Sequence, residues 1–201
     1  MRSLRKSYVK RSACAFAALL TLLPGAQAIA QQWTLSGDES SLSFISVKAE
    51  HIAEVHSFAR LSGEIESGGE AVVSIDLTSV QTGIDIRNER MQSMLFNTDM
   101  YPRAQVSAEV DIAALASMGV GESALLEVPL AINLHGEVLT MTAPLRVSHV
   151  QEGLRVDTLA PIIVKADAFA LVDGIESLRE IAGLPSIGRS VPVSFSLLFS
   201  Q

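Results

Sequence analysis

The sequence contains a single cysteine, Cys14, which lies in an N-terminal stretch that we expect to be removed from the mature protein. A mature chain without cysteine forms no disulfide and offers neither a thiol nucleophile nor a thiolate metal ligand. Its stability must therefore come from packing, and about 170 residues are enough for one domain with a substantial core.

Long apolar runs are also missing. The apolar run over residues 13–23 is shorter than the ~20 residues that a helix needs to cross a bilayer. Basic residues precede it, and the small residues that follow it include Ala26, Ala28 and Ala30. This layout is typical of a secretory signal peptide. We therefore predict a signal peptide over residues 1–28, with cleavage after residue 30 as the alternative, a single domain over 31–201, export to the periplasm and no stable membrane insertion.

Positive charge is scarce in the expected mature part. The whole chain has 15 basic and 22 acidic residues and a formal net charge of −7. Five of the basic residues and no acidic residue lie in residues 1–28, so the mature part carries a net charge of −12. Such an acidic surface repels phosphate backbones and anionic membrane surfaces. We therefore expect no nucleic-acid partner.

The motifs of common enzyme classes are absent as well. The sequence has no G-x-S-x-G element, no phosphate-binding loop and no dinucleotide-binding fingerprint. Its histidines are His51, His56, His135 and His149, and they form no H-E-x-x-H or comparable cluster. We therefore expect no catalytic residue, no metal site and no cofactor. A metal- or haem-associated redox role at His51 and His56 is the alternative hypothesis.

The dominant pattern of the sequence is an alternation of apolar and polar residues with period two. One face of the segment over residues 190–201 carries Val191, Val193, Phe195, Leu197 and Phe199. Similar alternation over residues 126–134 and 139–147 predicts a hairpin that turns near Gly136. Further strands are expected over residues 33–35, 42–47, 58–66, 71–78, 104–112, 154–159 and 162–166. About eight short strands of this kind favour an all-β sandwich or barrel.

Two segments depart from this alternation. Residues 173–183 place Asp173 at an N-cap position, Glu176 at the capping-box position and Gly183 at the end, which predicts a short amphipathic helix. Residues 87–96 form a weaker helical pattern with apolar residues on one side. We expect both helices to fold over one end of a barrel.

One long motif spans residues 80–104. It reads V-x-T, then arginine followed by an acid or amide, a leucine-like residue, x-S, x-x-F and finally Y-P-x-A. The matching residues are Val80, Thr82, Arg87, Asn88, Met91, Ser93, Phe96, Tyr101, Pro102 and Ala104. This motif resembles the signature of the YceI-like family. Weaker matches on both sides of it extend the resemblance over nearly the whole mature chain.

The resemblance implies a closed antiparallel, lipocalin-like β-barrel of about eight strands with one or two short helices and an elongated cavity. It also implies an exported binding protein for an amphiphilic, lipid-like ligand, such as a polyisoprenoid, a quinone or a fatty-acid derivative. The candidate ligand-binding residues are Phe44, Phe58, Ile75, Leu77, Met91, Leu95, Phe96, Tyr101, Ile132, Met141, Phe169, Phe195 and Leu197. Inward apolar residues either line such a cavity or fill a solid core. A structural or interaction barrel without a ligand is therefore the alternative hypothesis. The sequence does not decide between a monomer and a homodimer.

The sequence departs from the family pattern in two places, and one of them is the segment over residues 173–183, for which the family has no clear counterpart. His56 stands where the family usually has glycine, and the segment from residue 51 to 58 is interpreted as a shortened loop. Within the long motif, Arg87 and Asn88 either bind a ligand headgroup or tie down backbone carbonyls and a carboxylate. We favour the structural role for both.

Overall fold

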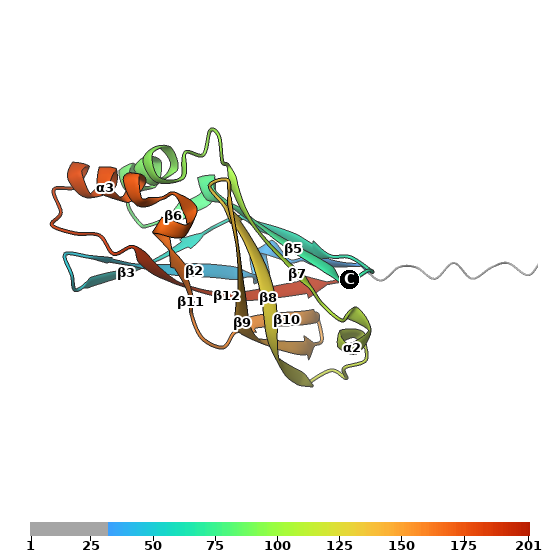
Figure 1. The fold of residues 1–201 in the computed structure, drawn as a ribbon. Helices are drawn as coiled ribbons and strands as arrows, with labels where there is room; N and C mark the ends of the chain where they lie inside the picture. The colour runs from blue at the N-terminus through green and yellow to red at the C-terminus, as the bar shows by residue number, and fades with distance from the viewer. Residues whose placement is uncertain (1–31) are drawn as a thin grey trace, which may run out of the picture.

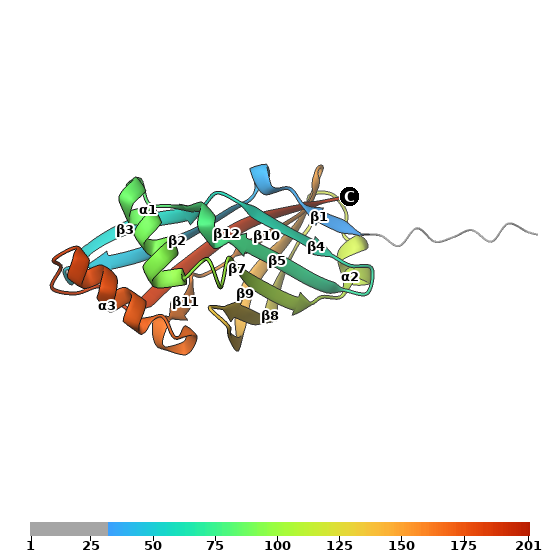
Figure 2. The ribbon, with the colours of Figure 1, turned by 90° about the horizontal axis from the view of Figure 1, so that it is seen from above.

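The computed structural model describes residues 32–201. The signal peptide predicted over residues 1–28 and its cleavage site therefore lie outside the described residues. The described part of the chain is mostly strands, with short helices gathered near the two ends of an elongated body (Figures 1 and 2). No helix within residues 32–201 is long and apolar enough to cross a membrane.

The structure contains twelve strands within residues 32–201. Eight form the barrel ring: β1 (Trp33–Leu35), β4 (Leu61–Ile65), β5 (Glu70–Asp76), β7 (Arg103–Glu109), β8 (Ser123–Leu134), β9 (Glu137–Val150), β10 (Gly153–Thr158) and β12 (Ser190–Ser200). The other four are β2 (Ser41–Lys48), β3 (Ile52–Phe58), β6 (Val80–Gln81) and β11 (Ile162–Lys165). The helices are α1 (Asp85–Arg90), α2 (Ile112–Ala116), α3 (Val172–Ile181), the π-helix η3 (Met91–Phe96) and the short 3₁₀ turns η1 (Gly37–Glu39), η2 (Leu77–Ser79) and η4 (Ala166–Phe169).

The ring closes because its last strand pairs with its first. The strand order is β1-β4-β5-β7-β8-β9-β10-β12, and β12 then pairs antiparallel with β1 through Thr34 with Ser200 and Leu35 with Phe199. A closed ring leaves no unpaired edge. The predicted all-β, closed antiparallel barrel of about eight strands is thus confirmed.

The two ends of the barrel differ. The first half of β12 pairs with β11 on one side and with β2 on the other, and β3 and β6 continue the wall from β2. These strands extend the barrel at the end where α1 and α3 lie (Figures 1 and 2). The helix α2 and the C-terminus lie at the opposite end. The two helices predicted to fold over one barrel end are confirmed there.

The hairpin predicted near Gly136 is confirmed. β8 and β9 pair antiparallel from Ser123 with Ser148 to Leu134 with Glu137. The two turn residues, His135 and Gly136, have φ values of 55° and 85°. Positive φ at both central residues is the backbone geometry that matches the twist of two hairpin strands.

The end of the barrel near α2 is filled by side chains. Trp33, Ile65, Leu115, Leu154 and Phe199 are all buried there as members of one apolar cluster. Leu154 has no exposed surface at all. This end is therefore closed by a packed core, and any large internal space must lie toward the other end.

The segment predicted as a shortened loop over residues 51–58 is strand β3, so that prediction was wrong. β3 pairs with β2 over residues 52–57. Its polarity is inverted: Glu54 and His56 line the barrel interior, whereas Val55 is 70% exposed. Alternation identifies a strand only when the inward residues are apolar, and β3 lacks that signal.

Other strand ends also differ from the prediction. The strand predicted over residues 58–66 corresponds to β4 alone, because Phe58 ends β3 and the chain turns before Leu61. The strand predicted over 71–78 ends at Asp76, and Leu77 begins the 3₁₀ turn η2. The Asp76 carboxylate accepts a hydrogen bond from the backbone N–H of Thr78 at 2.9 Å, which stabilises that turn.

Residues 32–201 contain three α-helices rather than the one or two predicted. The extra helix is α2, where Asp111 accepts a hydrogen bond from the N–H of Ala114 at 3.0 Å and so caps an alanine-rich segment. The predicted capping box of α3 is wrong: no side chain caps its first turn within the described chain. Glu176 instead pairs with Arg179 at 2.7 Å and with Arg189 at 2.9 Å.

Candidate functional site

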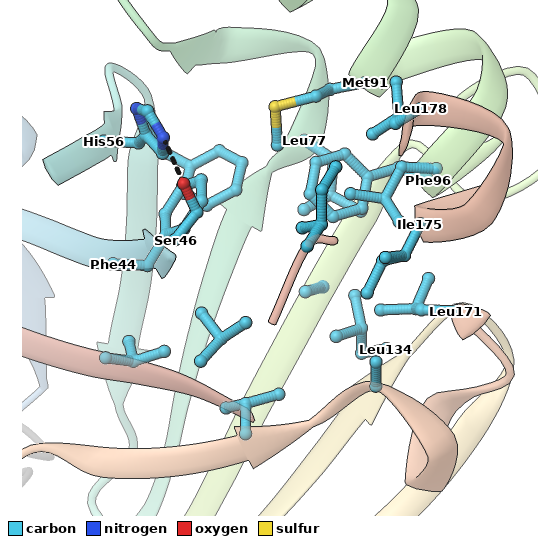
Figure 3. A pocket seen from close by; sticks show the side chains of 18 of the residues that line it. Phe44, Ser46, His56, Leu77, Met91, Phe96, Leu134, Leu171, Ile175 and Leu178 are labelled. Carbon is cyan, nitrogen blue, oxygen red and sulfur yellow. Dashed lines mark hydrogen bonds between the residues drawn. The ribbon is translucent and has the colours of Figure 1, made fainter. Parts of the chain in front are cut away.

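A cavity of about 490 Å³ lies inside the extended end of the barrel. Strands β2, β3, β5, β7, β8, β11 and β12 form its wall, and α1, η3 and α3 contribute lining residues as well. In Figure 3, Phe44, Leu77, Phe96 and Ile175 point into the same space from different elements. The volume falls within the range of about 300–1,000 Å³ that is typical of small-molecule sites.

A second, smaller cavity of about 90 Å³ adjoins the first. The two share the lining residues Leu42, Ile75, Val106, Leu130 and Phe195. The smaller cavity reaches Leu154, Phe199 and Leu115 at the filled end of the barrel, and its lining is almost entirely apolar. The internal space is therefore elongated and runs from the helices toward the barrel floor.

Three aromatic rings form one side of the larger cavity. The ring centroids of Phe44 and Phe58 are 5.4 Å apart, and those of Phe58 and Phe96 are 6.0 Å apart. These separations are typical of aromatic contact. The rings join β2, β3 and η3 across the cavity wall.

The helices that cover the cavity are packed closely against each other. A Cβ atom at Gly174 in α3 would lie 2.7 Å from the carbonyl oxygen of Met94 and 2.8 Å from the Cα of Leu95. Only glycine permits this approach of α3 to η3. Met91 and Leu95 line the cavity from the same helical segment.

The rim of the cavity is apolar and partly open to solvent. Ile84, Ile86 and Ile181 line the cavity, and their exposed fractions are 48%, 51% and 49%. Because each of these residues faces both the cavity and solvent, they mark its mouth between α1 and α3.

Polar side chains line the cavity at one corner, between β2, β3 and α1. The Ser46 hydroxyl and the His56 Nε2 atom are hydrogen-bonded at 2.9 Å (Figure 3). Beyond them, Glu54 forms salt bridges of 2.9 Å with both Lys48 and Arg87. The rest of the lining is dominated by apolar side chains, so the cavity has one polar end.

The structural role favoured for Arg87 and Asn88 matches their contacts. Arg87 donates hydrogen bonds to the Glu54 carboxylate and to the carbonyl oxygen of Thr82. The Asn88 side-chain oxygen accepts hydrogen bonds from the Thr82 N–H at 2.9 Å and hydroxyl at 2.7 Å. Both residues therefore anchor the start of the segment that covers the cavity.

The environment of the polar corner shifts two pKa values. Burial lowers the pKa of His56 below its ordinary value of 6.5, and the nearby positive charge of Arg87 lowers it as well. The hydrogen bond from Lys48 holds the pKa of Glu54 below its ordinary value of 4.5. At neutral pH His56 is therefore uncharged and Glu54 is ionised.

We expect His56 to make the stability of the protein fall at mildly acidic pH. Below about pH 6.5 the unfolded chain binds a proton at His56 that the folded protein does not, so the free energy of unfolding decreases toward the lower folded-state pKa. The His56→Gln substitution removes the imidazole that binds this proton. Urea unfolding at about pH 7.5 and pH 5.5 should show a smaller loss for the variant than for the wild type. Equal losses in the two proteins would contradict this assignment.

The structure brings together most of the candidate ligand-binding residues. Those that line the larger cavity are Phe44, Phe58, Ile75, Leu77, Met91, Leu95, Phe96, Ile132 and Phe195. Leu197 lines the smaller cavity. The other three lie elsewhere: the tilted rings of Tyr101 and His135 are in contact with centroids 4.6 Å apart, Met141 packs against the apolar core, and Phe169 is completely buried.

Sequence reasoning missed two groups of lining residues. The first comes from α3 and the segments beside it and includes Leu171, Ile175 and Leu178; for Ile175 and Leu178 the apolar side of the predicted helix was the available signal. The second is the polar corner on β3, where Glu54 and His56 lie in the segment predicted as a loop. His51, considered with His56 for a metal, is exposed near the β2–β3 turn. No three metal-ligating side chains gather anywhere in residues 32–201.

The fold and the cavity together define a closed antiparallel β-barrel with an apolar internal cavity, the architecture of lipocalin-like barrels. The family model for the YceI-like domain matches residues 33–199. The chain therefore belongs to the YceI-like domain family.

Solved structures agree with this assignment. A polyisoprenoid-binding domain from Saccharophagus degradans, implicated in plant cell wall breakdown, is 41% identical over 84% of this chain and 97% of that chain, with a TM-score of 0.82. BcnA from Burkholderia cenocepacia is 16% identical over 83% of this chain and 99% of that chain, with a TM-score of 0.60. The Campylobacter jejuni YceI protein is 11% identical over 73% and 84% of the two chains, with a TM-score of 0.51. The last two show likeness of fold alone. No curated protein sequence matches this chain.

Proposed function

We propose that this protein binds a lipid-like amphiphile and holds its hydrocarbon tail inside the barrel. The observation that carries the proposal is the elongated apolar space formed by the cavities of about 490 Å³ and 90 Å³. Burial of apolar surface stabilises a complex by about 25 cal/mol per Å², so a long hydrocarbon tail supplies most of the binding energy. The similarity to the polyisoprenoid-binding domain of Saccharophagus degradans supports a polyisoprenoid as the first candidate, with a quinone or a fatty-acid derivative next.

The proposed ligand enters between α1 and α3. The half-exposed Ile84, Ile86 and Ile181 offer an apolar path from solvent into the cavity. The role is binding or carriage rather than catalysis, because the larger cavity presents a mostly apolar lining with polar groups at one corner only.

Transfer from vesicles tests the proposal. Purified protein is incubated with phosphatidylcholine vesicles that contain a prenyl alcohol, the vesicles are removed by flotation, and the prenyl alcohol in the protein fraction is extracted and quantified. We expect close to one molecule per chain. Prenyl alcohol that stays with the vesicles at every protein concentration, with the same result for a quinone and a fatty acid, would refute the proposal.

Export to the periplasm is the second part of the proposal. It rests on the basic, apolar and small-residue layout of residues 1–28. Fractionation of cells that produce the full chain should release a shortened protein with the periplasmic contents, and N-terminal sequencing should start at residue 29 or 31. A full-length protein in the cytoplasmic fraction would contradict export.

A further inference from the structure

The inward side chains of β2 and β3 change in polarity step by step along the hairpin. On β2 the order from the barrel centre outward is Phe44, Ser46 and Lys48, all of which line the cavity. The opposite strand runs antiparallel, with Phe44 facing His56 and Ser46 facing Glu54 in the pairing register. An apolar zone is thus followed by a hydrogen-bonding zone and then by a charged zone.

The deep end of this gradient is aromatic on both strands. Phe58 is the last residue of β3, and its ring stacks on that of Phe44 with centroids 5.4 Å apart. A chain of carbon atoms fits this zone, whereas a polar group placed there would lose its hydrogen bonds to water. An amphiphile is therefore oriented with its tail toward the barrel centre and its head toward the outer end of the hairpin.

The charged groups that line the cavity are mostly basic, although the described chain is acidic. Ten basic and 22 acidic residues lie in residues 32–201. Three of the ten basic residues, Lys48, Arg87 and Arg90, line the larger cavity. Among the described residues only one acid, Glu54, does so, and the lining therefore carries a formal charge of +2. A net positive charge around the polar end of an apolar cavity favours an anion.

Two buried nitrogen atoms at this end have no hydrogen-bond partner within the described chain. They are the Nδ1 atom of His56 and the Nε atom of Arg87. His56 is only 4% exposed, and the Arg87 Nε–H is an obligatory donor. Both atoms are enclosed by protein, so a ligand oxygen reaches them only after a small movement of the surrounding side chains; a donor that gains such a partner no longer destabilises the fold.

We propose that the ligand carries an anionic oxygen headgroup, a carboxylate or a phosphate, which binds between Lys48, His56 and Arg87 at the polar corner between β2, β3 and α1. This inference rests on the proposed lipid-binding function and adds the charge and the position of the head. Arg90 contributes long-range attraction from the adjoining helix α1. Glu54 forms salt bridges with both Lys48 and Arg87 and therefore competes with an anionic head for them.

The test compares three probes with the same prenyl chain that differ only in the head: the alcohol, the carboxylic acid and the monophosphate. Binding is measured for the wild type, for the double variant Lys48→Gln, Arg90→Gln and for Glu54→Gln. Arg146→Gln is the matched control, because it removes one positive charge from an exposed position that does not line the cavity. Thermal unfolding of each variant confirms that it is folded.

We expect at least one of the two anions to bind the wild type about tenfold or more tightly than the alcohol, which corresponds to about 1.4 kcal/mol. The double variant should remove most of this preference, Glu54→Gln should increase it, and Arg146→Gln should leave it unchanged. A preference for the monophosphate alone or for the acid alone identifies the anion. Equal binding of all three probes would overturn the headgroup assignment and leave the proposed function intact, whereas no binding of any probe would refute both.

Discussion

Replacing Ala104 with tryptophan is expected to abolish lipid retention while the barrel stays folded. Ala104 lies on β7, is 8% exposed and lines the larger cavity beside its pairing partner Ile75. An indole at this position projects into the space that the ligand tail would occupy, and a tryptophan side chain covers about 150–250 Å². Because the side chain enters an existing cavity, we expect the free energy of unfolding to change by less than about 2 kcal/mol.

The matched control is Gln105→Trp. Gln105 is the next residue of β7, is exposed and does not line either cavity. In the vesicle-transfer assay Ala104→Trp should extract almost no prenyl alcohol, and Gln105→Trp should extract as much as the wild type. Full extraction by a folded Ala104→Trp protein would show that the lipid binds outside the barrel.

Gly153→Ala should produce the largest loss of stability among single substitutions at glycine. Gly153 begins β10 with a φ of 146°, and an added Cβ would lie 2.0 Å from the carbonyl oxygen of Phe199. The contact is with the backbone of β12, which cannot move without breaking the ring near its closure with β1. Backbone strain and the clash together should cost about 3 kcal/mol or more.

Differential scanning calorimetry measures this effect. Each kcal/mol lowers the Tm by about 2–4 °C for a chain of this size, so the variant should melt at least about 6 °C below the wild type. Gly68→Ala is the control, because no atom lies within 4 Å of the added Cβ. A Gly153→Ala protein as stable as the Gly68→Ala protein would show that β10 and β12 separate easily.

The ring of the barrel was predictable from the sequence because apolar and polar residues alternate along its long strands. β8, β9 and β12 alternate apolar and polar residues over long stretches, and Gly136 supplies the positive φ that the hairpin turn needs. The residues at which the strands end were harder to predict. Asp111 ends β7 early by capping α2, a local hydrogen bond that competes with continuation of the strand.

The polar corner was not predictable from alternation. β3 carries Glu54 and His56 on its inner side and the 70%-exposed Val55 on its outer side, which reverses the usual order. Such an inversion is costly in a protein core unless the polar groups have partners, and here Ser46, Lys48 and Arg87 provide them. The segment where the pattern failed is thus the segment that gives the cavity its polar end.

Sequence alone also leaves open whether the barrel is hollow. Met141 and Ala143 on β9 continue the same alternation as the lining residues of the barrel, yet they pack in the core and line neither cavity. Tyr101, a residue of the family motif, is structural, because its ring lies over the β8–β9 turn and a Cβ at Gly136 would be 3.1 Å from it. Only the relative positions of α3, η3 and β2 show where space remains.

Native mass spectrometry tests the central claim most directly. The purified chain is measured before and after incubation with prenyl lipids, alongside the Ala104→Trp variant. The cavity described above predicts a wild-type complex with one amphiphile per chain and a variant that stays empty. Wild-type protein that carries no adduct under any of these conditions, or an adduct that the tryptophan does not displace, would contradict a lipid held inside the barrel.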